Sequence, residues 1–202
     1  MKTRTGITGS TLKWAAIILM AIDHIGAGIL ENFVLNIWGR SPMGYHFAEQ
    51  WETIFAVDGV LRMIGRPAFP IFCFLLVEGF CHTHDVKKYA VRLGIFALVS
   101  EIPFDLALWN QVPDWQYQNV FFTLLIGLLA MLAVRRYGTN TALKVLILAA
   151  GAVLAEFLHT DYGAFGVLFI GILYCCGTIG NGSASWEPRA VCGSLRPRWH
   201  FC

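Results

Sequence analysis

Long apolar runs, separated by short polar stretches, recur along almost the whole chain. A helix that crosses the hydrocarbon core of a bilayer needs about 20 mostly apolar residues at 1.5 Å rise per residue. The runs are continuous, rich in Leu, Ala and Gly, and show no strand-like alternation, which excludes a transmembrane β-barrel. They cover about residues 12–30, 67–81, 89–109, 119–134, 141–159 and 163–177. The pattern therefore predicts an all-α polytopic membrane protein with about six transmembrane helices.

The stretch Val57–His84 combines an almost wholly apolar segment, Pro67–Cys81, with charged residues. Arg62 and Arg66 lie four residues apart before the apolar run, and Glu78 lies within it. Each charge in a spanning helix costs roughly 2.5–3.5 kcal/mol on insertion scales, so such groups usually face a partner or a wet cavity. Pro67 disfavours helical geometry at Arg66, which predicts a short outer helix followed by a second helix. The two arginines either act on charge in a site or extend to the lipid headgroups.

The connections between the runs indicate the topology. Residues 31–58 are too polar to span a membrane, and we expect them to form a tryptophan-containing connection. The loops at 110–118 and 160–162 contain no Lys or Arg. If the N-terminus is cytoplasmic, the first outer connection has only Arg40 away from the span, and one side of the membrane holds Lys2, Arg4, Lys13, Lys87, Lys88, Arg92, Arg135, Arg136 and Lys144. By the positive-inside rule, both termini are predicted to be cytoplasmic.

The last part of the chain differs from the rest. Residues 1–177 form the predicted transmembrane helical domain, whereas residues 178–202 are rich in Gly, Ser, Pro and Arg and show no periodicity. We expect this segment to be an irregular cytoplasmic tail, either flexible or an aberrant or truncated C-terminus.

Composition adds constraints on partners. Hydrophobic residues make up 56% of the chain and charged residues 14%, which is typical of a protein whose main partner is the lipid bilayer. The net charge of +2 does not indicate a nucleic-acid partner. The six cysteines follow no metal-binding spacing, so we predict no metal site.

On this topology, the polar residues at membrane depth fall into two layers. The outer layer contains Asp23, His24, Arg62, Arg66, Glu101, Asp105, Asn119, Thr123 and Asp161. The inner layer contains Glu78, His82, His84, Lys87, Lys88 and Arg92. The two layers suggest a pocket with a chemical end at the outer leaflet and a cationic mouth at the inner leaflet.

His24 is the candidate general base of the outer layer. Asp23 and His24 are adjacent, so on a helix they point about 100° apart and cannot pair with each other. Glu101 and Asp105, four residues apart on one helix face around Pro103, are the expected carboxylate partners of the imidazole. A neutral imidazole held in this way could accept a proton. The other interpretation is a core histidine inside a salt-bridged bundle, and Asn119 has the residue type of a helix N-cap.

Five blocks, in this order, carry a family resemblance: TLKWAAIILMAIDHIGA, LRMIGRPAFPIFCFLLVEGFCHT, KKYAVRLGIFALVSEIPFDLAL, NVFFTLLIGLLA and DYGAFGVL. Together they resemble the TraX family, named for a conjugal-transfer protein that acetylates the N-terminus of F-type pilin. That family is related to membrane acyltransferases that use acetyl-CoA. The resemblance covers about residues 11–174, after which relatives usually continue with further apolar segments and this chain leaves the pattern.

The resemblance implies an acetyl-CoA-dependent acetyltransferase in the bacterial inner membrane. The acceptor would be an amine, such as a pilin-like N-terminus, or a hydroxyl of an envelope protein at the outer face. The expected catalytic residues are His24, Asp23, Arg62, Arg66, Glu101 and Asp105. The expected cofactor-binding residues are Lys87, Lys88, Arg92, Glu78 and Asn119, the cations being suited to the phosphates of acetyl-CoA.

Two other functions fit the same residues. Charged residues and proline-broken helices at membrane depth also describe proton-coupled secondary transporters, although the chain shows no convincing internal repeat. A non-catalytic membrane partner in pilus or envelope assembly is the third possibility.

Overall fold

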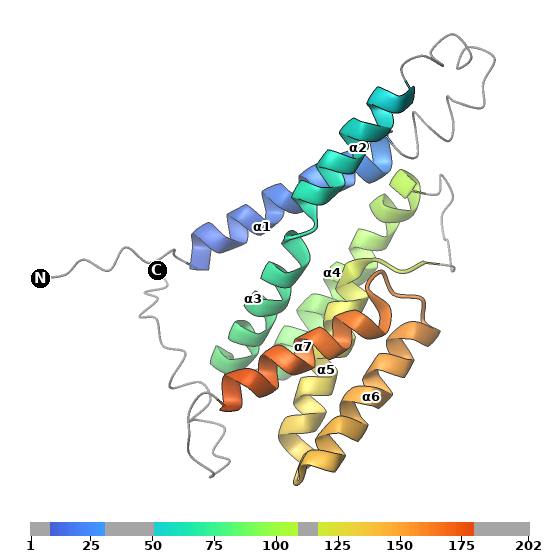
Figure 1. Cartoon of the computed structure of the whole chain (residues 1–202). Helices are drawn as coiled ribbons and strands as arrows, with labels where there is room; N and C mark the ends of the chain where they lie inside the picture. The colour runs from blue at the N-terminus through green and yellow to red at the C-terminus, as the bar shows by residue number, and fades with distance from the viewer. Residues whose placement is uncertain (1–8, 31–50, 109–116, 180–202) are drawn as a thin grey trace, which may run out of the picture. The chain divides into compact units, whose positions relative to one another are not determined.

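The computed structural model describes residues 9–30, 51–108 and 117–179, and this part of the chain is almost wholly helical (Figure 1). The helices are α1 (Gly9–His24), α2 (Trp51–Gly65), α3 (Ala68–His82), α4 (Val86–Leu108), α5 (Val120–Tyr137), α6 (Thr141–Phe157) and α7 (Gly163–Ile179). Residues 25–30 continue α1 as a π-helical segment. The described residues contain no strand beyond one isolated bridge, Gln118 with Thr160. The all-α prediction is therefore confirmed.

Three of the described helical segments are long and apolar enough to cross a membrane: Gly9–Leu30, Glu52–His82 and Val120–Tyr137. Gly163–Cys176 is apolar but shorter. Helix α4 has the length but carries five charged residues, Lys87, Lys88, Arg92, Glu101 and Asp105. The chain is a helical membrane protein. That it has six spans stays a prediction.

Large apolar side chains on the helix surfaces fit this environment. Trp14, Val153, Phe157 and Phe165 are all more than 60% exposed, with Phe157 at 77%. Water-soluble monomers rarely leave such extended apolar faces in contact with solvent. These side chains are suited to contact with lipid tails.

The break between α2 and α3 follows the prediction. Helix α2 ends at Gly65, Arg66 and Pro67 form a turn, and α3 begins at Ala68. The Arg66 amide still donates to the Arg62 carbonyl at 3.0 Å, while the Arg66 carbonyl accepts from Phe69 at 3.3 Å. Helix α2, however, begins at Trp51, within the stretch 31–58 that we expected to be a connection. Pro103 does not end α4, which continues to Leu108.

The described residues belong to two compact units. One contains α1, α2, the first turn of α3 and residues 104–108, and the other contains residues 73–103 and 117–179. In the first unit α1 packs against α2. The approach is closest at Gly65, where an added Cβ would lie 2.3 Å from the Asp23 Cβ and 2.7 Å from its Cα. Any side chain at Gly65 would therefore separate the two helices.

In the second unit α5, α6 and α7 pack against one another (Figure 1). Their shared core contains Ile126, Ala130, Ala155 and Val167, with Leu148 packed against it. Small residues allow the close approach that membrane helices need in the absence of a strong hydrophobic driving force. Gly127 faces Ile170, Gly151 faces Ala130 and Val167, and Gly171 faces Leu148.

Two ring contacts add α3 to this bundle. Phe80 of α3 packs edge-to-face on Tyr174 of α7, with ring centroids 5.6 Å apart. The Arg135 guanidinium of α5 lies 4.5 Å from the centroid of the same Phe80 ring. Phe80 is only 1% exposed, so it anchors the end of α3 between two helices.

The glycine contact between α1 and α2 can be tested with a matched pair of variants. Gly65→Ala should lower the thermal unfolding midpoint of the detergent-solubilised protein, because overpacking of this kind costs about 1–3 kcal/mol. Gly59→Ala, on the same helix, meets nothing within 4 Å. It should be neutral or stabilise by about 0.5–1 kcal/mol through helix propensity. Equal midpoints for the two variants would contradict the close approach at Gly65.

Candidate functional site

An ion pair joins α1 to α2 within the apolar part of the first unit. Arg62 Nη1 donates to Asp23 Oδ2 at 2.7 Å, and the two side chains are 35% and 22% exposed. Both charges belong to segments apolar enough to span a membrane, where an uncompensated charge is costly. The sequence predicted that Arg62 needs a partner but did not identify Asp23 as that partner.

His24, the next residue after Asp23, is oriented by its own helix. Its Nδ1 lies 2.8 Å from the Met20 carbonyl oxygen, one turn earlier. A carbonyl oxygen can only accept, so Nδ1 carries the proton and the lone pair of the neutral ring lies on Nε2. The side chain is exposed. Nδ1 therefore bonds to a backbone carbonyl, where we had expected the carboxylate of Glu101 or Asp105.

Glu101 is instead joined to Asn119 in the second unit. Glu101 Oε2 accepts from the Asn119 backbone amide at 3.2 Å and from Asn119 Nδ2. Asn119 Nδ2 also donates to the Ala97 carbonyl at 2.8 Å, and Asn119 Oδ1 accepts from the Phe121 amide at 2.9 Å. Asn119 is 2% exposed. The predicted N-cap of α5 is thus confirmed, and the same side chain ties α4 to α5.

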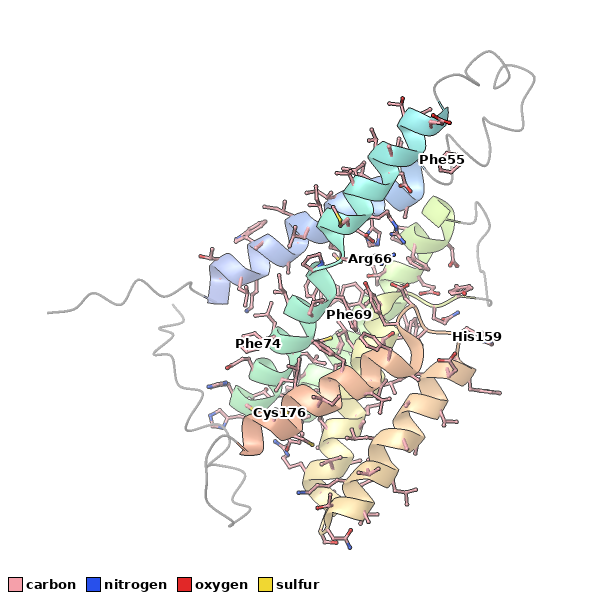
Figure 2. The ribbon with its side chains drawn as sticks, viewed as in Figure 1. Phe55, Arg66, Phe69, Phe74, His159 and Cys176 are labelled. Atoms are coloured by element: carbon pink, nitrogen blue, oxygen red, sulfur yellow. The ribbon has the colours of Figure 1, made fainter. Side chains whose placement is uncertain are left out.

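Two other residues of the expected outer site have separate positions. Asp105 follows Glu101 by four residues on α4 and is 1% exposed. Arg66 lies in the turn between α2 and α3, and its side chain is exposed (Figure 2). Arg66 does not share the ion pair of Arg62, although the two residues lie four positions apart.

The expected inner layer lies around the end of α3 and the start of α4. His82 Nδ1 is 3.1 Å from Glu78 Oε2 and 2.8 Å from the Glu78 carbonyl oxygen. Asp85 caps α4, because its Oδ1 accepts from the Lys88 amide at 3.1 Å. Its Oδ2 lies 3.4 Å from Lys88 Nζ, an exposed pair that contributes little to stability. Of the two acids in this layer, Glu78 lies against His82 and Asp85 lies against Lys88.

The cations of this layer remain accessible. The side chains of Lys87, Lys88 and Arg92 are all exposed on the first two turns of α4. The described residues contain no group of three or more His, Cys, Asp or Glu side chains able to hold a metal ion. An anionic ligand is the chemistry that these exposed cations suit.

Asp58 is a residue that our sequence reasoning missed. Its Oδ1 is buried and has no hydrogen-bond partner in the part of the chain that the structure describes. The same oxygen lies 3.0 Å from the position that a Cβ on Gly26 would occupy. The available signal was its spacing, since Asp58 precedes Arg62 by four residues on α2.

Apolar helices with an internal ion pair and an oriented histidine define this chain as an integral membrane protein with a polar site. The family model described as TraX protein matches residues 8–192, and the chain belongs to this family. The match extends beyond Tyr174, where we had expected the resemblance to end.

A curated relative is the probable fimbrial assembly protein FimC, serogroup H1, of Dichelobacter nodosus. The two sequences are 34% identical over 170 residues, covering 80% of this chain and 59% of the relative. The chain thus matches a little over half the length of that protein. No solved structure matches the chain.

The buried amide of Asn119 gives a stability prediction. Asn119→Ala removes the Nδ2 donor to the Glu101 carboxylate and to the Ala97 carbonyl, together with the cap on the Phe121 amide, and each lost hydrogen bond contributes about 0.5–1.5 kcal/mol. Asn140→Ala removes a solvent-exposed N-cap that makes one bond, to the Leu143 amide at 2.8 Å. That control should cost about 1 kcal/mol. Unfolding midpoints in detergent should fall clearly further for Asn119→Ala, and equal losses would reduce Asn119 to a simple cap.

Proposed function

We propose that this protein is an integral-membrane acetyltransferase that moves an acetyl group from acetyl-CoA to an acceptor amine or hydroxyl. The observation that carries the proposal is the contact of His24 Nδ1 with the Met20 carbonyl oxygen, from which the tautomer of the ring follows. With Nδ1–H donated to Met20, the lone pair on Nε2 is the one that can take a proton. This base stands next to the Asp23–Arg62 ion pair in a chain of the TraX family.

In the proposed reaction the acceptor attacks the thioester carbonyl while His24 Nε2 takes its proton. The new bond to the acceptor forms, the carbon–sulfur bond breaks, and the CoA thiolate leaves and takes the proton that His24 accepted. Arg62 offers five N–H donors in a planar fork, and the ion pair uses Nη1. The remaining donors, together with exposed Arg66, are suited to stabilise the oxyanion that develops on the thioester oxygen.

The name of the relative supports a role in pilus biogenesis. FimC of Dichelobacter nodosus is described as a probable fimbrial assembly protein. We propose a pilin-like or other envelope protein as the acceptor, presented at the outer face of the bacterial inner membrane. The N-terminus of the chain is proposed to be cytoplasmic, in agreement with the distribution of Lys and Arg.

A binding surface for acetyl-CoA is proposed at the start of α4. CoA carries several phosphate charges, and Lys87, Lys88 and Arg92 are exposed cations on two successive turns. With a cytoplasmic N-terminus these residues face the compartment that contains acetyl-CoA. We do not include Glu78 among the proposed phosphate contacts, since its carboxyl group lies against His82.

His24→Gln tests the general base. Glutamine keeps much of the size and some hydrogen bonding but cannot act as the base. Acetyl transfer by the purified protein to an N-terminal pilin peptide should fall by a factor of about 10²–10⁴. His159→Gln is the matched control, because His159 is also an exposed histidine, at the end of α6. Transfer at the wild-type rate by His24→Gln would exclude His24 as the base.

The cationic cluster predicts a separate kinetic effect. Changing Lys87, Lys88 and Arg92 together to Gln should raise the KM for acetyl-CoA with a smaller change in kcat, since phosphate contacts are equally present in the ground and transition states. The charge-preserving variant, with the two lysines changed to Arg and Arg92 to Lys, should keep the native KM. Labelling of inverted membrane vesicles with acetyl-CoA is the measurement. An unchanged KM in the Gln variant would separate the cluster from the cofactor.

A further inference from the structure

Two carboxylates, Asp23 and Asp58, lie close to the Arg62 side chain. Asp23 approaches from α1 and holds Nη1 at 2.7 Å. Asp58 lies on α2 itself, one helical turn before Arg62, so both side chains project from one helix face. One arginine thus has two candidate anionic partners from two helices.

Gly26 shows that Asp58 and Arg62 are close neighbours. A Cβ added to Gly26 would lie 3.0 Å from Asp58 Oδ1 and 3.4 Å from Arg62 Cδ. The aliphatic stem of Arg62 and the Asp58 carboxylate therefore converge on the same point of α1. The i, i+4 spacing of the two residues on α2 lets the Arg62 guanidinium reach the Asp58 carboxylate by a change of rotamer.

The buried carboxylate oxygen of Asp58 gives a reason for its position beside Arg62. A buried polar atom without a hydrogen bond normally costs free energy, and such atoms call for a structural reason. Asp58 Oδ1 is buried and unpartnered among the described residues while Arg62 is paired with Asp23. Exchange of Arg62 from Asp23 to Asp58 would replace one ion pair with another, so the two arrangements differ little in charge compensation.

We infer that Asp58 is a positioning residue: it is a second carboxylate with which Arg62 can form an ion pair in place of Asp23. In the first arrangement, which the structure shows, Arg62 binds Asp23. In the second arrangement, Arg62 binds Asp58. The Asp23 carboxylate, next to His24, is then free for the polar group of the acceptor. The second half of this inference rests on the proposed function, whereas the exchange itself depends only on the three side chains.

A double-mutant cycle tests the exchange. Asp23→Asn and Asp58→Asn each leave Arg62 one carboxylate, so each single variant should insert and unfold near the wild-type midpoint in detergent. The double variant leaves Arg62 without a carboxylate in an apolar segment. Its midpoint should fall by roughly 2–4 °C or more beyond the sum of the single effects. If the double variant unfolds like Asp23→Asn alone, Asp58 is not a partner of Arg62.

Three controls make the result specific. When the cycle is repeated with Arg62→Met, the non-additive fall in midpoint should vanish. If the double aspartate variant fails to insert, adding Arg62→Met should restore its insertion. In the Asp23→Asn background, Asp58→Glu keeps a carboxylate and should keep the midpoint. Glu52→Gln, an exposed acid on the same helix, should add no coupling to Asp23→Asn. Coupling that persists without Arg62 would overturn the inference.

The cycle requires no acetyl transfer, so its outcome is independent of the proposed activity. In a protein shown to be active, Asp58→Asn should lower kcat with an unchanged KM for acetyl-CoA, because Asp58 acts through Arg62 and not on the cofactor. An active protein with native kcat in Asp58→Asn would remove Asp58 from the reaction and leave the stability coupling as a separate result.

Discussion

The charge of Arg62 inside an apolar helix is the constraint on which the first unit depends. Without a counter-charge it would cost several kcal/mol at membrane depth. Asp23 supplies that charge at 2.7 Å, but only because α1 and α2 approach closely. The approach in turn requires that Gly65 has no side chain where it faces Asp23, and Gly26 leaves little room beside Asp58 and Arg62. The ion pair and Gly65 therefore form one structural requirement.

The second unit solves the same problem with an amide. Asn119 satisfies the start of α5, the Ala97 carbonyl and one Glu101 oxygen with a single neutral side chain. Glycines at positions 127, 151 and 171 then allow α5, α6 and α7 to pack closely. Polar groups join α4 to α5, while α5, α6 and α7 associate through close van der Waals packing. Both kinds of contact are usual between membrane helices, because lipid tails weaken the hydrophobic driving force.

Local features were predictable from the sequence, and long-range partners were not. Pro67 breaks the helix and Asn119 caps the next one, because both effects act within a few residues. The start of α2 at Trp51 was missed, since the polar composition of residues 31–58 hides its helical turns. The partners of Asp23 and Glu101 lie 39 and 18 residues away. Several carboxylates at similar depth were equally plausible from spacing alone. For His24, Nδ1 contacts the Met20 carbonyl one turn away, where we had expected a distant acid.

That difference bears on how His24 could work as a base. A carboxylate on Nδ1 would both fix the tautomer and stabilise the imidazolium formed on proton uptake, whereas a neutral carbonyl mainly fixes the tautomer. The compensating negative charge must then come from a neighbour through space. Asp23 is adjacent in sequence, but its charge is neutralised while it holds Arg62. Movement of Arg62 to Asp58 would restore that charge beside His24 at the moment when the imidazole becomes cationic. In the proposed mechanism, the exchange of one arginine between two aspartates thus supplies the negative charge for the imidazolium, which the neutral backbone carbonyl cannot supply.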